Sequence, residues 1–230
     1  MQEDFHYQDS YRDHYLRVGM VYPSVFSLKM FLGNNPKLNL SETDIKSKTI
    51  LDIGFGDGRD LVLFHNLGLT TYGIEVDEEI VAHTSSKFND MGLDVNVSVG
   101  YNDNTGFTTN TFDYVYSVAA LMYLRNEATT ISDVLKHVYS ITKHGGYFMG
   151  TFTRSNSFIT KGASTIDENR IILKDPFYKF REGQIYHLHH SKLEVERDLS
   201  DAGFINCLVC NYDIDWFGTR ETAFMFVARK

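Results

Sequence analysis

The sequence is poor in basic residues and contains no basic run. Its 230 residues include 22 lysines and arginines against 30 aspartates and glutamates, so the formal net charge is −8. Proteins that bind nucleic acid draw most of their affinity from lysine and arginine contacts to phosphates. The charge balance therefore argues against a nucleic-acid partner.

Long apolar stretches are also missing. No segment approaches the roughly 20 apolar residues that cross a bilayer as a helix. The start of the chain, residues 1 to 4, is acidic and lacks the charged-then-apolar pattern of a secretory signal. We therefore expect a soluble cytoplasmic protein without a membrane partner, present as a monomer or a homodimer.

Cysteine is nearly absent. The two cysteines, Cys207 and Cys210, form a Cys-x-x-Cys pair, which in other contexts indicates a redox pair or half of a zinc site. They lie in a strand-like run, where an odd spacing places the two thiols on opposite faces. No second cysteine pair completes a tetrahedral site. We therefore expect both cysteines to be structural.

The chain is organised around residues 49 to 61. The first part, Thr49 to Ile53, is an almost continuous apolar run, typical of a central parallel strand covered on both faces. Glycines then occupy the alternate positions 54, 56 and 58, and a helical pattern follows. Such a junction offers free backbone N–H groups and the positive end of a helix dipole, and glycines let a ligand approach the main chain. We interpret it as a cofactor cradle.

The glycine spacing indicates which cofactor binds. A dinucleotide fingerprint requires a third glycine three residues after the second, where this sequence has Arg59. The order Asp-x-Gly-x-Gly-x-Gly instead resembles motif I of the class I S-adenosylmethionine-dependent methyltransferases. The resemblance implies S-adenosyl-L-methionine as cofactor and S-adenosyl-L-homocysteine as product. It implies cofactor contacts at Asp52, Gly54, Phe55, Gly56 and Gly58.

A second strand, residues 70 to 75, ends in an acid. Glu75 lies where a carboxylate at the end of the neighbouring strand accepts both hydroxyls of a ribose, and the resemblance implies that role. The alternative is an acid that stabilises the dipole of the next helix. Because residues 77 to 79 are also acidic and supply that role, we favour ribose binding. Val76 would then pack on the adenine.

The strand of residues 94 to 99 alternates polar and apolar residues, as expected of an outer strand. Members of the family usually carry a Gly-Asp pair just beyond it, and the acid binds the adenine amino group. This chain has Gly100 and Tyr101 instead. A backbone N–H of Asn102 or the carboxylate of Asp103 is expected to substitute.

Later segments extend the resemblance. Residues 111 to 117 match the Phe-Asp-x-Val pattern that opens the fourth strand, which implies that Ser117 and Val118 lie beside the methyl donor. The Asn/Asp/Ser-Pro-Pro-aromatic sequence of amino-directed nucleic-acid methyltransferases is missing there. A helix over 130 to 142 is closed by glycines 145 and 146, and a strand follows over 147 to 152. The tail predicts a helix over 191 to 202 and strands over 204 to 215 and 222 to 228.

The resemblance implies an α/β fold, a three-layer sandwich with a seven-stranded, mostly parallel sheet whose last strand is antiparallel. We expect a methyltransferase domain over residues 49–230, with residues 153–190 inserted as a lid hairpin that selects the substrate. Residues 1–48 would form a helical cover, in which Ser24 caps a helix. By resemblance Tyr11, Tyr15, Arg17 and Tyr22 lie near the site. Docking of these tyrosines on the sheet is an equally good interpretation.

Within the expected lid, His187 and His189 share one face of a strand. Imidazoles suit zinc or iron, but no pair of acids lies nearby in the sequence, and metal-dependent members of this superfamily rely on carboxylates. We therefore expect no metal, and a solvated or substrate-contacting hairpin. The candidates for a catalytic base are His187, His189, Tyr11 and Tyr15.

These observations predict a methyltransferase that acts on an oxygen or nitrogen of a small molecule. Candidate acceptors are a sugar, a nucleotide-linked sugar or a secondary metabolite. The first alternative is a non-catalytic or regulatory protein that binds S-adenosylmethionine with the same fold. The second is a nicotinamide-dependent oxidoreductase.

Overall fold

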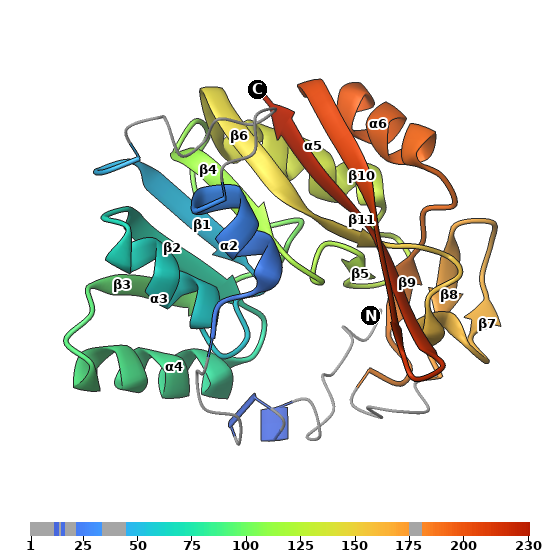
Figure 1. Cartoon of the computed structure of the whole chain (residues 1–230), viewed down its shortest axis with the longest axis horizontal. Helices are drawn as coiled ribbons and strands as arrows, with labels where there is room; N and C mark the ends of the chain where they lie inside the picture. The colour runs from blue at the N-terminus through green and yellow to red at the C-terminus, as the bar shows by residue number, and fades with distance from the viewer. Residues whose placement is uncertain (1–11, 14, 17–21, 34–44, 175–180) are drawn as a thin grey trace.

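The computed structural model describes residues 12–13, 15–16, 22–33, 45–174 and 181–230 (Figure 1). Its helices are α2 (Val25–Phe31), α3 (Arg59–Asn66), α4 (Glu78–Asp90), α5 (Ile131–Ile141) and α6 (Lys192–Asp201), with a 3-10 turn, η2 (Phe158–Thr160). The strands are β1 (Thr49–Ile53), β2 (Thr70–Glu75), β3 (Val95–Val99), β4 (Phe112–Ser117), β5 (Tyr123–Leu124), β6 (Thr142–Thr153), β7 (Ser164–Thr165), β8 (Arg170–Ile172), β9 (Ile185–His187), β10 (Ile205–Trp216) and β11 (Thr219–Arg229).

Seven strands form the main sheet in the order β10-β11-β6-β4-β1-β2-β3. β1, β2, β3, β4 and β6 pair in parallel, whereas β11 is antiparallel to both of its neighbours. The expected α/β fold with an antiparallel last strand is therefore confirmed. Because β1 is central, the turn that follows it opens at the middle of the carboxyl edge, where open parallel sheets bind ligands.

Helices cover both faces of this sheet (Figure 1). Alternation along β1 shows the two layers: Ile50 packs in a cluster with side chains of α2, α3 and α4, and Leu51 packs in a cluster with side chains of α5 and α6. Both side chains are fully buried. The strand is thus covered on both faces, which explains the nearly continuous apolar run in its sequence.

Helix α2 begins where the sequence predicts. The Ser24 side chain accepts a hydrogen bond from the Ser27 amide, and Phe26 and Phe31 are buried. The Ser24 N–H also donates to Asp60 Oδ1 at 2.7 Å. α2 therefore packs on the sheet beside α3 through both apolar and polar contacts.

The junction between α5 and β6 differs from the expectation. The helix ends at Ile141 and β6 begins at once with Thr142, so the two glycines lie inside the strand rather than closing the helix. Thr142 caps the helix instead, since its hydroxyl donates to the Val138 carbonyl at 2.7 Å. Gly145 takes a positive φ of 78°, and its N–H donates to the Lys230 carbonyl. Sequence reasoning missed this arrangement because the chain end supplies the partner.

A second, smaller antiparallel sheet has the order β5-β9-β8-β7. β8 and β9 are the two strands expected between residues 170 and 188, and they pair antiparallel. β5 was not anticipated; it comes from the loop after β4, and Tyr123 pairs with Tyr186. A third apolar cluster, centred on Met122, Ile171 and Tyr186, packs this sheet.

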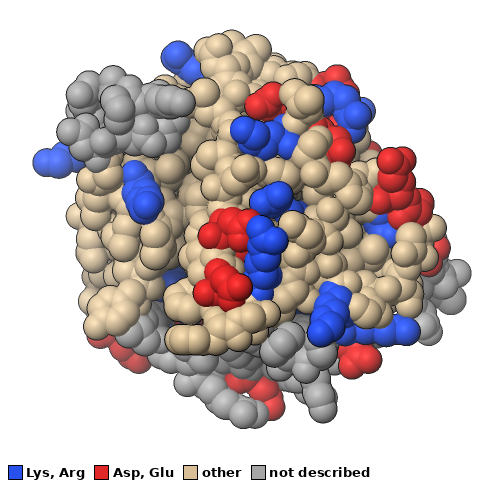
Figure 2. Space-filling model, turned by 45° about the vertical axis from the view of Figure 1, so that its right-hand side comes forward, with Lys and Arg blue, Asp and Glu red and all other residues tan. Residues whose placement is uncertain are grey.

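The structure also describes the surface charges, the apolarity of the helices and the state of the cysteines. On the face in Figure 2, the coloured basic side chains stand among acidic ones and form no continuous basic surface. Among the described helices, none combines the length and apolarity needed to span a membrane. Both cysteines are free; Cys207 is half-buried and Cys210 is exposed on β10.

Candidate active site

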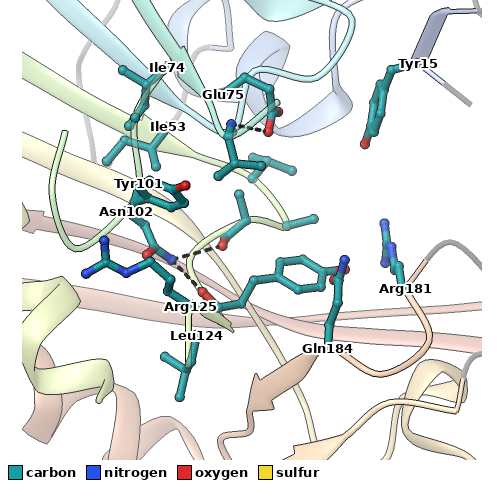
Figure 3. A pocket seen from close by; sticks show the side chains of 17 residues that line it. Tyr15, Ile53, Ile74, Glu75, Tyr101, Asn102, Leu124, Arg125, Arg181 and Gln184 are labelled. Carbon is teal, nitrogen blue, oxygen red and sulfur yellow. Dashed lines mark hydrogen bonds between the residues drawn. The ribbon is translucent and has the colours of Figure 1, made fainter. Parts of the chain in front are cut away.

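A cavity opens at the carboxyl ends of β1, β2 and β4 (Figure 3). It brings together seven of the residues that the sequence predicts for the site, namely Tyr15, Gly54, Glu75, Val76, Tyr101, Asn102 and Val118. These residues come from segments that are far apart in the chain, and the parallel sheet aligns their ends on one edge.

The glycine turn and the acid at the end of β2 meet directly. The Gly56 N–H donates to Glu75 Oε2 at 3.1 Å, and the Val76 N–H donates to Glu75 Oε1 at 2.8 Å. Gly54 and Gly56 have positive φ values of 76° and 57°, which favour glycine. The Glu75 side chain is buried and thus fixes the shape of the turn.

Two residues expected to contact the cofactor pack against protein instead. Gly58 precedes α3 with a φ of 79°, and a Cβ there would lie 2.6 Å from Phe88 and 2.9 Å from Thr84. Gly58 therefore allows α4 to approach the turn. Phe55 is buried against Gly73 of β2, where a Cβ would meet the Phe55 ring at 2.7 Å. Neither residue lines the cavity, and a role in shaping the turn explains both.

The acids of the turn are buried beneath it. Burial, followed by the negative charges of Asp60 and Glu75, raises the pKa of the Asp52 carboxyl well above its usual value. Asp52 is 3 % exposed and lies outside the cavity lining. Ser117, also expected at the site, is fully buried and donates to the Ile53 carbonyl at 2.8 Å. Ser117 therefore ties the end of β4 to the end of β1.

At the opposite end of the cavity, Asn102 ties two loops together. Its Nδ2 donates to the Tyr123 carbonyl at 2.9 Å and to the Leu121 carbonyl at 3.2 Å. Asp103 does not line the cavity, because its carboxylate accepts from Arg125 Nη2 at 2.8 Å. Arg125 in turn lies over the Tyr101 ring, 4.9 Å from its centroid. No sequence motif indicates Arg125.

The Tyr15 side chain of the N-terminal segment reaches the turn. A Cβ on Gly56 would lie 2.5 Å from Tyr15 Cε1, so the Tyr15 ring stands directly over the glycine. The guanidinium of Arg12 anchors this segment to Asp77 at 2.9 Å. Tyr22 is 75 % exposed and does not line the cavity. Tyr11 and Arg17, the other candidates in this segment, lie outside the described residues.

Two residues from the segment before β9 complete the cavity and were missed by sequence reasoning. Arg181 and Gln184 both line it, and Figure 3 shows them on the same side of the cavity, with Arg181 toward Tyr15. Gln184 is 7 % exposed, and neither its Oε1 nor its Nε2 has a hydrogen-bond partner among the described residues. Buried side-chain amides are normally paired. This amide therefore has the properties of a ligand contact.

A second cavity adjoins the first and shares Val118, Ala119 and Arg181 with it. Its walls come from α2, η2, the ends of β6 and β9, and the β10–β11 hairpin, and include Phe26, Phe158, Thr153, Tyr186, Tyr212 and Glu221. Ala119 stands at the junction with a positive φ of 57°, and its N–H donates to Thr151 Oγ1 at 2.9 Å. Strained backbone of this kind clusters at functional sites.

The two candidate histidines lie elsewhere. His187 and His189 are 7 % and 1 % exposed, and neither is among the residues that line the two cavities. His189 Nε2 lies 3.1 Å from Asp198 Oδ2 of α6. Burial, followed by the charge of His189, lowers the pKa of His187 to about 3. The structure therefore does not place these imidazoles at the cavity.

The first cavity fits a nucleoside cofactor. The buried Glu75 carboxylate holds a turn with positive φ at Gly54 and Gly56, and Ile74, Val76 and Val118 line the cavity beside it. Gly54 lines the cavity, whereas Gly56 does not, because the Tyr15 ring stands over it. The donor and acceptor groups thus suit ribose hydroxyls and a flat apolar base.

Comparisons with known proteins agree with this geometry. Residues 50–146, somewhat under half of the chain, match a family model described as a methyltransferase domain. No curated protein sequence matches the chain.

Solved structures share the fold. A S-adenosylmethionine-dependent methyltransferase from Methanosarcina mazei is 22 % identical, with a TM-score of 0.61, over 80 % of this chain and 93 % of its own. The 1,6-didemethyltoxoflavin-N1-methyltransferase of Burkholderia thailandensis, solved with its acceptor and S-adenosylhomocysteine, is 16 % identical, with a TM-score of 0.64, over 96 % and 84 %. A phosphoethanolamine N-methyltransferase of Haemonchus contortus is 17 % identical, with a TM-score of 0.59, over 96 % and 60 %.

Proposed function

We propose, from the premise that the chain carries a class I S-adenosylmethionine-dependent methyltransferase domain, that it transfers a methyl group to an oxygen or nitrogen of a small molecule. The observation that supports this most directly is the contact between Gly56 and Glu75, which unites the glycine turn and the acid in one cradle.

In this proposal the first cavity holds the cofactor. Glu75 accepts the ribose hydroxyls, Val76 and Val118 enclose the adenine, and Gly54 and Gly56 let the main chain approach the amino-acid end. Tyr101 and Asn102 close the adenine side, because both line the cavity there. Asn102 acts through the loop that its amide holds rather than through a free carboxylate.

The second cavity is proposed to hold the acceptor. It meets the first at Val118 and Ala119, directly after β4, so a molecule in one cavity contacts a molecule in the other at that point. Aromatic rings and hydroxyl groups dominate its walls, with Arg181 near the junction and Glu221 on the β10–β11 hairpin. Such a lining suits a compact, polar acceptor with an apolar or aromatic part. The 1,6-didemethyltoxoflavin and phosphomonomethylethanolamine bound in two of the similar structures are compact molecules of this kind.

S-adenosylmethionine supplies a methyl group on a sulfonium, which an acceptor lone pair displaces in line. The protein's contribution is mainly alignment and exclusion of water. The Ala119 N–H held by Thr151 fixes the loop at the junction, and Tyr15 covers the glycine turn. Burial raises the pKa of the Tyr15 phenol, so this residue stays protonated near neutral pH and serves as a cover rather than as a base.

Two measurements test the proposal. Calorimetry with S-adenosylmethionine tests the cofactor cavity, and release of S-adenosylhomocysteine over a panel of amines, phenols and sugars tests turnover. Cofactor binding without turnover on any acceptor would favour the regulatory alternative. Binding of NADH in place of S-adenosylmethionine would favour the oxidoreductase.

Two variants of Tyr15 distinguish the contribution of its ring from that of its hydroxyl. Tyr15→Ala removes the ring over Gly56, and we expect S-adenosylmethionine to bind about tenfold more weakly, the loss of roughly 1.4 kcal/mol. Tyr15→Phe keeps the ring and is expected to bind within about twofold of the wild type. Calorimetry measures both. If Tyr15→Phe instead abolished turnover at unchanged cofactor affinity, the hydroxyl would be part of the chemistry.

The unpaired amide of Gln184 gives a prediction that requires no acceptor. Gln184→Met replaces a buried amide by an apolar side chain of similar length, and we expect the free energy of unfolding of the ligand-free protein to rise by about 1 kcal/mol. The affinity for S-adenosylhomocysteine should stay unchanged if the amide faces the acceptor. Urea unfolding and calorimetry decide: a lower stability would show that the amide is paired inside the protein, and weaker cofactor binding would assign it to the cofactor.

A further inference from the structure

Three potential metal ligands meet where the second sheet joins the last helix. His187 ends β9, His189 follows it, and Asp198 lies on α6. One ligand atom from each residue lies within 4.8 Å of the other two. Among the described residues, it is the one group of three or more histidine, cysteine or acidic side chains whose ligand atoms lie this close together. No pair of acids lies next to the histidines in the sequence. Asp198 is nine residues beyond His189, and the turn into α6 brings it beside the imidazoles.

Both imidazoles leave a buried nitrogen unpaired. His187 Nε2 and His189 Nδ1 are inaccessible to solvent and have no hydrogen-bond partner in the part of the chain that the structure describes. Orphaned buried polar atoms are costly and uncommon in native structures. The rings are neighbours, with centroids 4.7 Å apart, and His189 turns its Nε2 toward Asp198. The orphaned His187 Nε2 is therefore the atom that a ligand shared with His189 Nε2 and Asp198 would satisfy, whereas His189 Nδ1 lies on the other side of its ring.

We propose that His187, His189 and Asp198 bind one zinc ion. Two imidazoles and one carboxylate form a donor set that zinc accepts. Asp198 Oδ2 lies 3.1 Å from His189 Nε2, close to the edge of about 3.3 Å expected for a tetrahedron with bonds of about 2.0 Å. A water molecule would fill the fourth position.

The surroundings orient the carboxylate. Arg197 Nε donates to Asp198 Oδ1 at 3.1 Å, which leaves Oδ2 facing the imidazoles. The ring of Phe152 from β6 packs against His189, with centroids 4.5 Å apart, and limits the orientation of that imidazole. Contacts of this kind around metal ligands tune affinity. The ion would join the second sheet to α6, outside the lining of both cavities.

The test uses the full chain without an affinity tag, stripped of metal with a chelator and titrated with zinc. We expect one equivalent to bind and the melting temperature to rise. Asp198→Asn and His187→Gln should each weaken zinc binding at least about tenfold. His190→Gln is the matched control, because His190 belongs to the same run but is exposed and contacts the Glu168 carbonyl. This variant should bind zinc as the wild type does.

Cobalt gives a second measurement that needs no variant. Cobalt in a tetrahedral site of nitrogen and oxygen ligands absorbs in the visible range without the near-ultraviolet charge transfer of a thiolate. That spectrum, lost on addition of one equivalent of zinc, is expected for the wild type. Failure to bind either ion, unchanged affinity in the folded Asp198→Asn and His187→Gln proteins, or a thiolate band from Cys207 or Cys210 would each overturn the proposal.

Discussion

Gly56→Val should weaken S-adenosylmethionine binding at least about 100-fold while leaving the protein folded. The backbone at Gly56 has a φ of 57°, and a Cβ there would meet the Tyr15 ring at 2.5 Å. A β-branched residue at positive φ costs roughly 1–3 kcal/mol, and relief of that strain would pull the Gly56 N–H away from Glu75. The side chain would also displace the Tyr15 ring, which lines the cavity over this glycine.

The matched control for this change is Gly92→Val. Gly92 also has a positive φ, 66°, but a Cβ there meets nothing within 4 Å, and it follows α4 away from the cavity. Both variants should stay folded in urea unfolding, with the smaller loss of stability in Gly92→Val, and only Gly56→Val should lose cofactor affinity by calorimetry. Equal affinity in the two variants would place the cofactor elsewhere on the protein.

Local sequence patterns predicted the sheet because the burial of each strand determines its pattern of apolar and polar residues. β1 is mostly apolar because both of its faces are covered, and β3 alternates because it lies at an edge. Ser24 and the acids before α4 are capping residues whose effect extends over one helical turn. Strand patterns and helix caps depend on residues close by in the chain, so they can be predicted from a single sequence.

The parts of the site that were missed depend on contacts between distant segments. Gly58 and Gly56 have the same residue type and similar φ values, yet Gly58 faces α4 and Gly56 faces Tyr15. No spacing rule distinguishes them, because the partner is set by tertiary packing. Arg181 and Gln184 reach the cavity only because β9 pairs with β5, a strand of two residues with no periodic signal.

The histidine run shows the same limit. His187 and His189 were correctly expected to share a face, since residues two apart in a strand do so. Their surroundings were not foreseeable: the structure buries both rings, and the acid beside them is Asp198, from the next helix. A rule that searches for acids close in sequence misses a carboxylate delivered by the fold.

Glu75→Ala is expected to reduce cofactor affinity by at least about 100-fold, more than the loss of a ribose contact alone. A hydrogen bond to a charged group contributes roughly 1.5–3 kcal/mol, and Glu75 accepts two backbone N–H groups, from Gly56 and Val76, in addition to its proposed ribose contact. Its removal would leave both N–H groups unpaired at a buried position and release the glycine turn.

Glu75→Gln separates the charge of this residue from its geometry. Glutamine keeps one acceptor oxygen in nearly the same position, so the turn retains one of its two backbone contacts. We therefore expect the affinity of Glu75→Gln for S-adenosylmethionine to lie between those of the wild type and Glu75→Ala. Glu79→Ala, an exposed acid four residues on, controls for net charge and should bind S-adenosylmethionine normally. Because Glu75 also raises the pKa of buried Asp52, Glu75→Ala relieves a like-charge repulsion while it removes the two hydrogen bonds. The free energy of unfolding of Glu75→Ala should therefore fall by less than its free energy of binding S-adenosylmethionine. Equal losses in the two free energies would show that Glu75 serves the fold rather than the cofactor.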